Sequence, residues 1–138
     1  GDGKKLDFLK DLAKKMQIEN KVIFTGRIPN TELPKLLQQS NIYISMPITE
    51  GVSASLFEAM ACGLPAIVPN SGGIQKIVSN EIDGYVYEHL NENELAIKME
   101  TLLLNESYES MVKSALQKVK KYDVKLYVEE LYKLYHAK

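Results

Sequence analysis

Residues 46–73 read MPITEGVSASLFEAMACGLPAIVPNSGG, and this stretch decides the fold. The small residues after its first glutamate predict a turn that leads from a strand into a helix over residues 54–62. Gly63 and Pro65 predict the end of that helix, and residues 66–68 are an apolar run typical of a buried strand. A helix that connects two buried strands indicates a parallel sheet with helices on its faces.

The rest of the chain continues this alternation of helix and strand patterns. Apolar residues at helical spacing predict helices over about 6–16, 31–39, 91–104, 108–120 and 124–135, and β-rich runs predict strands at 22–25, 42–45 and 85–87. Gly72-Gly73 opens a helical turn, and residues 80–84 are rich in turn formers. We find no repeat and no interior linker, and we therefore expect one α/β domain over residues 1–138, with a parallel sheet flanked by helices.

Composition excludes several classes of partner and site. The 138 residues are 45% apolar and 25% charged, as in soluble globular domains. With 17 basic and 18 acidic residues, the net charge of -1 gives no general attraction to nucleic acid or to an anionic membrane. The only cysteine, Cys62, excludes an intramolecular disulfide and a multi-cysteine metal site, and it fits a reducing compartment. The chain starts at Gly1 without an initiator Met, and we expect it to be a piece of a longer protein.

The motif coincides with the edge of the sheet where ligands are expected. Parallel sheets bind ligands at the carboxyl ends of their strands, where loops lead into helix N-termini. Gly26, Glu50 and the pair Gly72-Gly73 each follow a predicted strand and therefore belong to this edge. The sequence thus predicts a binding site built from these loops.

Different residues around the helix start could bind the diphosphate, the ribose and the sugar of a nucleotide sugar. The backbone amides of Ala54 and Ser55 lie at a helix N-terminus, where a diphosphate is stabilised. Glu58, one turn further, can accept two hydrogen bonds from a vicinal diol such as a ribose. Glu50 in the loop would reach the sugar ring, and Gly51 allows a close backbone approach. The spacing therefore predicts a nucleotide-sugar pocket.

The same residues also have a purely structural interpretation. Ser55-x-x-Glu58 fits a capping box, in which Glu58 only satisfies a free amide at the helix start. Gly63 and Pro65 would then serve only to end the helix. This interpretation leaves Glu50 and the small residues between the two glutamates unexplained.

Residues 50–78, EGVSASLFEAMACGLPAIVPNSGGIQKIV, closely resemble the Glu-x-x-x-x-x-x-x-Glu signature of retaining, GT-B-type glycosyltransferases, specifically family 4 (group 1). Three further segments resemble that family in the same order along the chain. Residues 1–3 resemble its G-D-G-P turn, residues 22–26 its V-x-F-x-G strand, and residues 83–85 its N-G-x-L/Y turn. The resemblance extends from residue 1 to about residue 104.

This resemblance implies a donor-binding domain, the second of two Rossmann-like halves of a GT-B fold, here without its first strand–helix unit. It gives Glu50 the catalytic position, in contact with the donor sugar, and Glu58 the ribose hydroxyls. The other donor-binding positions are Gly51, Val52, Ser53, Ala54 and Ser55 at the sugar and diphosphate, and Gly26, Arg27 and Ile28 along the base. Arg27 has an alternative interpretation as an ordinary surface residue after a strand.

The implied chemistry is transfer of a hexose with retention at the anomeric carbon, without a cofactor and without a metal ion bound by the protein. The resemblance implies front-side attack, in which Glu50 positions the donor and forms no covalent intermediate. Val52-Ser53 replace the Phe-Gly that is frequent in the family, so the identity of the donor sugar stays open.

The resemblance implies that some functional parts of the family lie outside this segment. The family's Arg and Lys that neutralise the diphosphate come before the G-D-G turn, and the acceptor domain is separate. Without those cations the leaving diphosphate loses its main electrostatic stabilisation. We therefore expect this polypeptide alone to bind a donor weakly and to transfer nothing.

The resemblance also implies partners and a location. We expect a UDP-sugar ahead of a GDP-sugar as donor, no nucleic acid, and a glycan or lipid-linked acceptor bound by the N-terminal domain in polysaccharide or glycoconjugate biosynthesis. We expect a cytoplasmic protein, with a peripheral position at the inner face of the membrane as a second option for the full-length form. Two other classes remain open: a non-catalytic nucleotide-binding module, and another GT-B-like enzyme such as a sugar-nucleotide epimerase or a phosphorylase.

The C-terminal helices carry lysines at 113, 118, 120, 121 and 125. We interpret them as one solvated helix face, with contact to lipid headgroups as the alternative.

Overall fold

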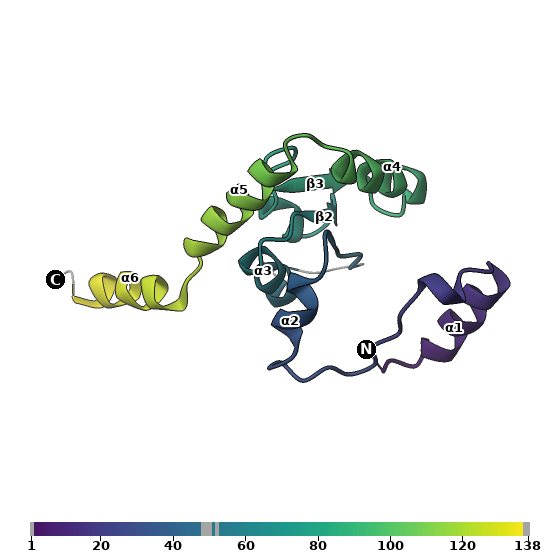
Figure 1. Ribbon diagram of the computed structural model, residues 1–138. Coiled ribbons are helices and arrows are strands. Elements are labelled where there is room, and N and C mark those ends of the chain that lie inside the picture. The colour runs from purple at the N-terminus through teal and green to yellow at the C-terminus, as the bar shows by residue number, and fades with distance from the viewer. Residues whose placement is uncertain (1, 48–50, 52, 137–138) are drawn as a thin grey trace. The chain divides into compact units, whose positions relative to one another are not determined.

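The computed structural model describes residues 2–47, 51 and 53–136, without the side chains of Tyr127 and Glu130. The chain divides into two compact units, Gly1–Leu33 and Pro34–Lys138 (Figure 1). The single domain over residues 1–138 stays a prediction.

The first unit holds α1 (Leu6–Lys15), followed by a short 3-10 helix (Glu19–Lys21). The sequence predicted α1 correctly. Two lysines in its last turn interact favourably with the negative end of the helix dipole. The strand predicted over residues 22–25 is wrong, because those residues pair with no strand in the described part of the chain. Val22 has extended dihedral angles, but the β-rich run lacks the partner that a ladder of hydrogen bonds requires, and Ile23 is 87% exposed.

The second unit is built on a parallel sheet, as the sequence predicted, and the structure shows its strand order to be β1-β2-β3. Its strands are β1 (Tyr43–Ile44), β2 (Ala66–Pro69) and β3 (Gly84–Tyr87). Its α-helices are α2 (Leu33–Gln38, which begins at the last residue of the first unit), α3 (Ala54–Ala61), α4 (Glu92–Leu103), α5 (Tyr108–Lys120) and α6 (Val124–His136). A 3-10 helix (Ile74–Lys76) takes the place of the helical turn predicted after Gly72-Gly73.

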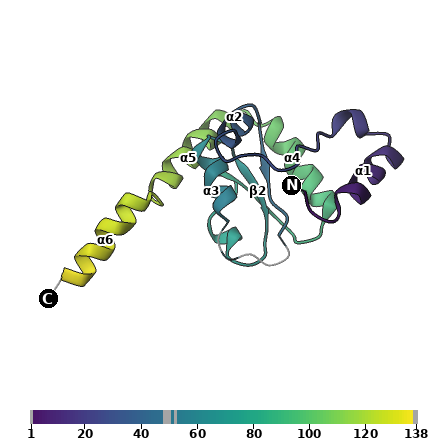
Figure 2. The ribbon, with the colours of Figure 1, turned by 90° about the horizontal axis from the view of Figure 1, so that it is seen from below.

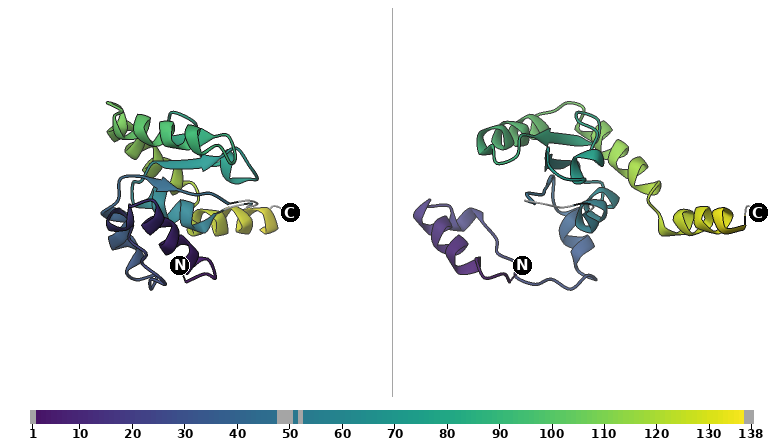
Figure 3. Two further views of the ribbon diagram at one scale, coloured as in Figure 1. Left: turned by 90° about the vertical axis from the view of Figure 1, so that its right-hand side faces the viewer. Right: turned by 180° about the vertical axis from the view of Figure 1, so that it is seen from behind.

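The sheet separates two apolar clusters. On one face, Ala66 and Val68 of β2 pack with Leu56 and Met60 of α3, and Figure 2 shows α3 lying along β2. On the other face, Ile67 packs with tyrosines of β3 and with Leu102 of α4. Figure 1 and both views of Figure 3 show α3 and α4 on opposite faces of the sheet. The α/β class with helices on both faces is therefore confirmed.

Two glycines are required by the packing of α3 and β2. Gly63 has a φ of +82° where α3 ends, as expected for the glycine that stops a helix. A Cβ atom on Gly84 would lie 2.0 Å from the carbonyl oxygen of Ala66, so β3 approaches β2 more closely than a side chain permits. Gly63 thus ends α3 shortly before β2, and Gly84 lets β3 pair closely with β2.

Candidate functional site

The candidate site begins at the carboxyl end of β1, in the loop that leads into α3. Residues 48–50 and 52 of this loop lie outside the described residues, and they include Glu50 and Val52. The predicted roles of Glu50 and Val52 therefore stay predictions. Gly51, Ser53, Ala54 and Ser55 are described.

Within the described residues, no side chain caps the N-terminus of α3. Ser53 is the N-cap residue and is 1% exposed, but its hydroxyl makes no capping hydrogen bond. It instead shares a hydrogen bond of 2.9 Å with the hydroxyl of Ser55. In that part of the chain the first amides of α3 therefore have no side-chain acceptor, and an anion is the acceptor that a helix N-terminus favours.

The capping-box interpretation of Ser55 and Glu58 is wrong. Helix α3 begins at Ala54, so Ser55 is already its second residue and cannot be the cap. Position 53 takes the cap because its backbone is extended, with φ -99° and ψ 112°. Glu58 then lies in the second turn, beyond the N3 position from which a capping-box carboxylate reaches back.

Tyr43 connects β1 to the start of α3. Its phenolic oxygen lies 2.7 Å from the hydroxyl of Ser55, which in turn contacts that of Ser53. Three hydroxyls thus form a chain beside the first turn of α3. The sequence did not single out Tyr43, because a tyrosine in an apolar strand is usually a core residue and only its contact across the fold gives it a further role.

The loop after β2 closes against the loop before α3. A Cβ atom on Gly73 would lie 2.1 Å from the carbonyl oxygen of Gly51, so only glycine permits this approach. Gly72, its neighbour, has a φ of +61°. The structure thus brings Gly51 and Gly72-Gly73 together at the carboxyl edge of the sheet, the edge to which the sequence assigned Gly72-Gly73.

Glu58 lies on the exposed side of α3. Within the described part of the chain, its carboxylate makes no hydrogen bond and no ion pair. It borders an open hollow of about 380 Å³ whose other lining residues are Phe57, Ala61, Val119, Lys120, Tyr122 and Asp123. The predicted base-contacting residues Gly26, Arg27 and Ile28 belong to the first unit, where Gly26 has a φ of +64°.

The loops after β2 and β3 are tied by Asn70. Its amide donates to the carboxylate of Glu88, and its side-chain oxygen accepts from the backbone amide of His89 at 3.0 Å. Nearby in sequence, the hydroxyl of Tyr87 is buried without a partner in the described residues. Burial raises the pKa of Tyr87 above its ordinary value, so this phenol stays protonated and neutral at physiological pH.

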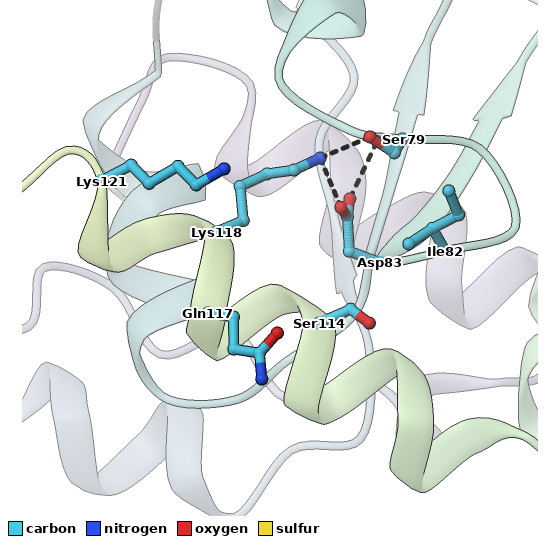
Figure 4. A pocket seen from close by; sticks show the side chains of 7 residues that line it. All are labelled: Ser79, Ile82, Asp83, Ser114, Gln117, Lys118 and Lys121. Atoms are coloured by element: carbon cyan, nitrogen blue, oxygen red, sulfur yellow. Dashed lines mark hydrogen bonds and ion pairs between the residues drawn. The ribbon is translucent and has the colours of Figure 1, made fainter.

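A second polar cluster lies at the opposite edge, where β3 begins. The carboxylate of Asp83 is 1% exposed and pairs with the ammonium of Lys118 on α5 (Figure 4). Lys118 also donates to the carbonyl of Ile77 and the hydroxyl of Ser79, each at 2.7 Å. Asp83 further accepts from the amide of Ser79 at 2.9 Å. The interpretation of Lys118 as part of a solvated face is wrong, since its three donors are all used inside the protein.

Residues 2–47, 51 and 53–136 contain no group of three or more His, Cys, Asp or Glu side chains that could hold a metal ion. No helix in that same part of the chain combines the length and apolar character needed to cross a membrane.

Known proteins are similar to this chain in sequence and in fold. Residues 1–119 match the family model of the glycosyl transferases group 1. An uncharacterized glycosyltransferase of Haemophilus influenzae is 32% identical over 133 residues, which is 94% of this chain and 37% of that protein. An Escherichia coli UDP-Gal:α-D-GlcNAc-diphosphoundecaprenol α-1,3-galactosyltransferase is 30% identical over 64% of this chain and 22% of its own length.

The fold is shared with the Anabaena protein HepE, solved in complex with UDP and glucose. The TM-score is 0.84 at 20% sequence identity, over 97% of this chain and 38% of HepE. The chain therefore spans about two fifths or less of the length of each protein compared. Because the family model covers residues 1–119, the chain belongs to the glycosyl transferases group 1 family.

Proposed function

We propose that this chain forms the donor-binding part of a retaining hexosyltransferase that uses a nucleotide sugar, with UDP preferred over GDP. The observation that carries the proposal lies at the start of α3, where the described residues offer no side-chain cap and, one turn later, no partner for the carboxylate of Glu58. An anion at the helix start and a diol at the carboxylate match the diphosphate and the ribose of a nucleotide. Membership of the family and the UDP bound to HepE support this assignment.

Each residue has a role in the proposed reaction. The amides of Ala54 and Ser55 bind the diphosphate, Glu58 accepts hydrogen bonds from the ribose, and Glu50 positions the sugar. The loop of Gly26, Arg27 and Ile28 lies along the base. The bond between the anomeric carbon and the diphosphate oxygen breaks, the acceptor oxygen bonds to the same face, and the acceptor proton passes to the leaving phosphate. Neither a cofactor nor a metal ion bound by the protein takes part.

The acceptor is proposed to be a glycan or a lipid-linked saccharide, bound outside this chain. The E. coli relative is named for a diphosphoundecaprenol acceptor, which supports the lipid-linked choice. A cytoplasmic location, or a peripheral one at the inner face of the membrane, fits such an acceptor. The chain alone is expected to transfer nothing, and turnover by the isolated 138 residues with any nucleotide sugar would contradict this.

An NMR titration of the chain with UDP, GDP, ADP and their sugars tests donor binding. Shifts confined to residues 26–28 and 50–58, largest for UDP and its sugars, are the expected result. Equal and scattered shifts for all nucleotides would count against the site. Glu50→Gln should weaken binding of the UDP-sugar and leave UDP unchanged, because Glu50 is assigned to the sugar.

Activity of the full-length parent separates an enzyme from a binding module. Transfer from a nucleotide sugar to an acceptor is the expected result. Binding of UDP without any turnover would favour the non-catalytic module, and interconversion of the donor sugar would favour an epimerase.

A further inference from the structure

The hollow beside Glu58 is formed by two segments that are far apart in sequence. Phe57, Glu58 and Ala61 line it from α3. The end of α5 and the turn that joins α5 to α6 supply Val119, Lys120, Tyr122 and Asp123. The turn therefore forms the second wall of a surface that begins at the candidate ribose contact.

Tyr122 is held in this wall by an aromatic contact. Its ring centroid lies 4.6 Å from that of Phe57, with 43° between the ring planes. Even so, 53% of Tyr122 is exposed. A ring that is anchored on one side and open on the other offers a flat apolar surface whose ordering costs little entropy on binding.

The hollow lies in line with the rest of the candidate site. Ala54, Glu58 and Ala61 are spaced four and three residues apart, so they share one side of α3. From the amide of Ala54 to Ala61 the helix rises by about 10 Å. A ligand that places its diphosphate at the helix start and its ribose at Glu58 therefore continues into the hollow.

The charges of the hollow select which part of such a ligand fits. The charged residues that line the hollow are two carboxylates, Glu58 and Asp123, and one lysine, Lys120. One oxygen of Asp123 already accepts from the amide of Lys125 at 2.8 Å. This balance disfavours a phosphate and suits an uncharged group with hydroxyl donors and a flat face, which is the description of a nucleoside.

We propose that Tyr122 is a further binding residue of the donor site, whose ring packs against the nucleoside while Glu58 binds the ribose hydroxyls. This inference rests on the proposed function and adds to it a residue from the turn between α5 and α6. Because the contact involves the nucleoside alone, it contributes to the affinity for UDP and not to that for pyrophosphate.

The test titrates UDP and pyrophosphate into the chain and into the Tyr122→Ala, Tyr122→Phe and Tyr135→Ala variants. Tyr122→Ala should weaken UDP binding about fivefold to tenfold, the lower part of the range for base–aromatic stacking, and leave pyrophosphate within about twofold. Tyr122→Phe keeps the ring and should bind UDP as the unchanged chain does. Tyr135 is 79% exposed on α6, and its replacement is the matched control, with no expected change.

Intermolecular NOEs between UDP and the Tyr122 ring of the unchanged chain provide a measurement that needs no variant. Their presence supports the inference even if Tyr122→Ala fails to fold. UDP shifts at residues 53–58, with no such NOEs and with equal affinity in Tyr122→Ala, would overturn the inference and leave the proposed function standing. A UDP titration that moves none of residues 53–58 would contradict the proposed function and the inference together.

Discussion

The polar groups at the two edges of the small sheet differ in how far the protein satisfies their hydrogen bonds. Where β3 begins, Asp83 and Lys118 meet each other, and Ser79 completes the hydrogen bonds of both. At the start of α3, the buried hydroxyl of Ser53 caps nothing, and Glu58 has no partner in the described residues. Completed hydrogen bonds hold the fold together, whereas polar groups with open bonding capacity are available to a ligand.

The largest expected effect comes from breaking the completed network. Lys118→Met removes the counterion of Asp83 and leaves a carboxylate buried, so the free energy of unfolding should fall by about 3 kcal/mol. Affinity for UDP should stay unchanged in the folded fraction, because the network lies at the other edge. Urea denaturation and a UDP titration measure the two quantities.

Lys121→Met is the matched control for this change. Lys121 lines the same pocket as Lys118 but is exposed, so its replacement should alter stability by no more than about 0.5 kcal/mol (Figure 4). If Lys118→Met proved as stable as Lys121→Met, the network of Asp83 and Lys118 at the start of β3 would not stabilise the fold.

Gly73→Ala tests whether the two loops of the ligand edge must touch. The added methyl would meet the carbonyl oxygen of Gly51 at 2.1 Å, and the backbone would have to move. We expect a loss of about 1–3 kcal/mol in stability and weaker UDP binding. Gly3→Ala, where a methyl meets no atom within 4 Å, is the control for the added methyl. Unchanged melting and unchanged binding in Gly73→Ala would show that the contact is dispensable.

Glu58→Gln removes a charge that the fold does not use. The neutral amide accepts weaker hydrogen bonds from a ribose diol, so the Kd for UDP should rise about tenfold. Stability should change by less than about 0.5 kcal/mol, because Glu58 is exposed. Isothermal titration and thermal melting separate the two effects. Glu129→Gln, at an exposed glutamate in the middle of α6, should change neither, and a Glu58→Gln variant that loses only stability would support a structural role.

Most of the second unit follows from local patterns in the sequence. The apolar run at 66–68 and the helical spacing at 108–120 are signals carried by neighbouring residues, and both elements formed where they were expected. Residues 22–25 carry the same kind of strand signal, but a strand also needs a partner, which local sequence does not specify. The local sequence pattern therefore predicts a helix or strand well when that element finds its packing partners within the same unit.

The chemistry of individual side chains was harder to predict. Lys118 belongs to a row of lysines that is regular in sequence, yet its position on α5 brings it to a buried aspartate from another segment. Ser55 fits a capping box by spacing, but the helix starts at Ala54 and so moves the cap to Ser53. In both cases a contact or a boundary set by the fold, and not the residue type, decides the role.

The smallest effect should come from Tyr43→Phe, which tests whether the hydroxyl chain at the ligand edge serves binding or only stability. The change removes the phenolic oxygen that lies 2.7 Å from the Ser55 hydroxyl and keeps the ring in the core. Ser55 then loses a partner that orients it beside the amides of α3, so the Kd for pyrophosphate and UDP should rise about twofold to threefold, with about 1 kcal/mol lost in stability.

Tyr108→Phe separates orientation from stability. The hydroxyl of Tyr108 donates to the carbonyl of Asn41 at 2.7 Å, so this change also removes one tyrosine hydrogen bond from the same unit, but at a distance along the chain from α3. It should lower the melting temperature about as much as Tyr43→Phe and leave both dissociation constants unchanged. If the two variants bound pyrophosphate equally well, the Tyr43 hydroxyl would belong with Lys118 among the groups that only hold the fold, and the open bonding capacity of the ligand edge would reduce to the amides of α3 and Glu58.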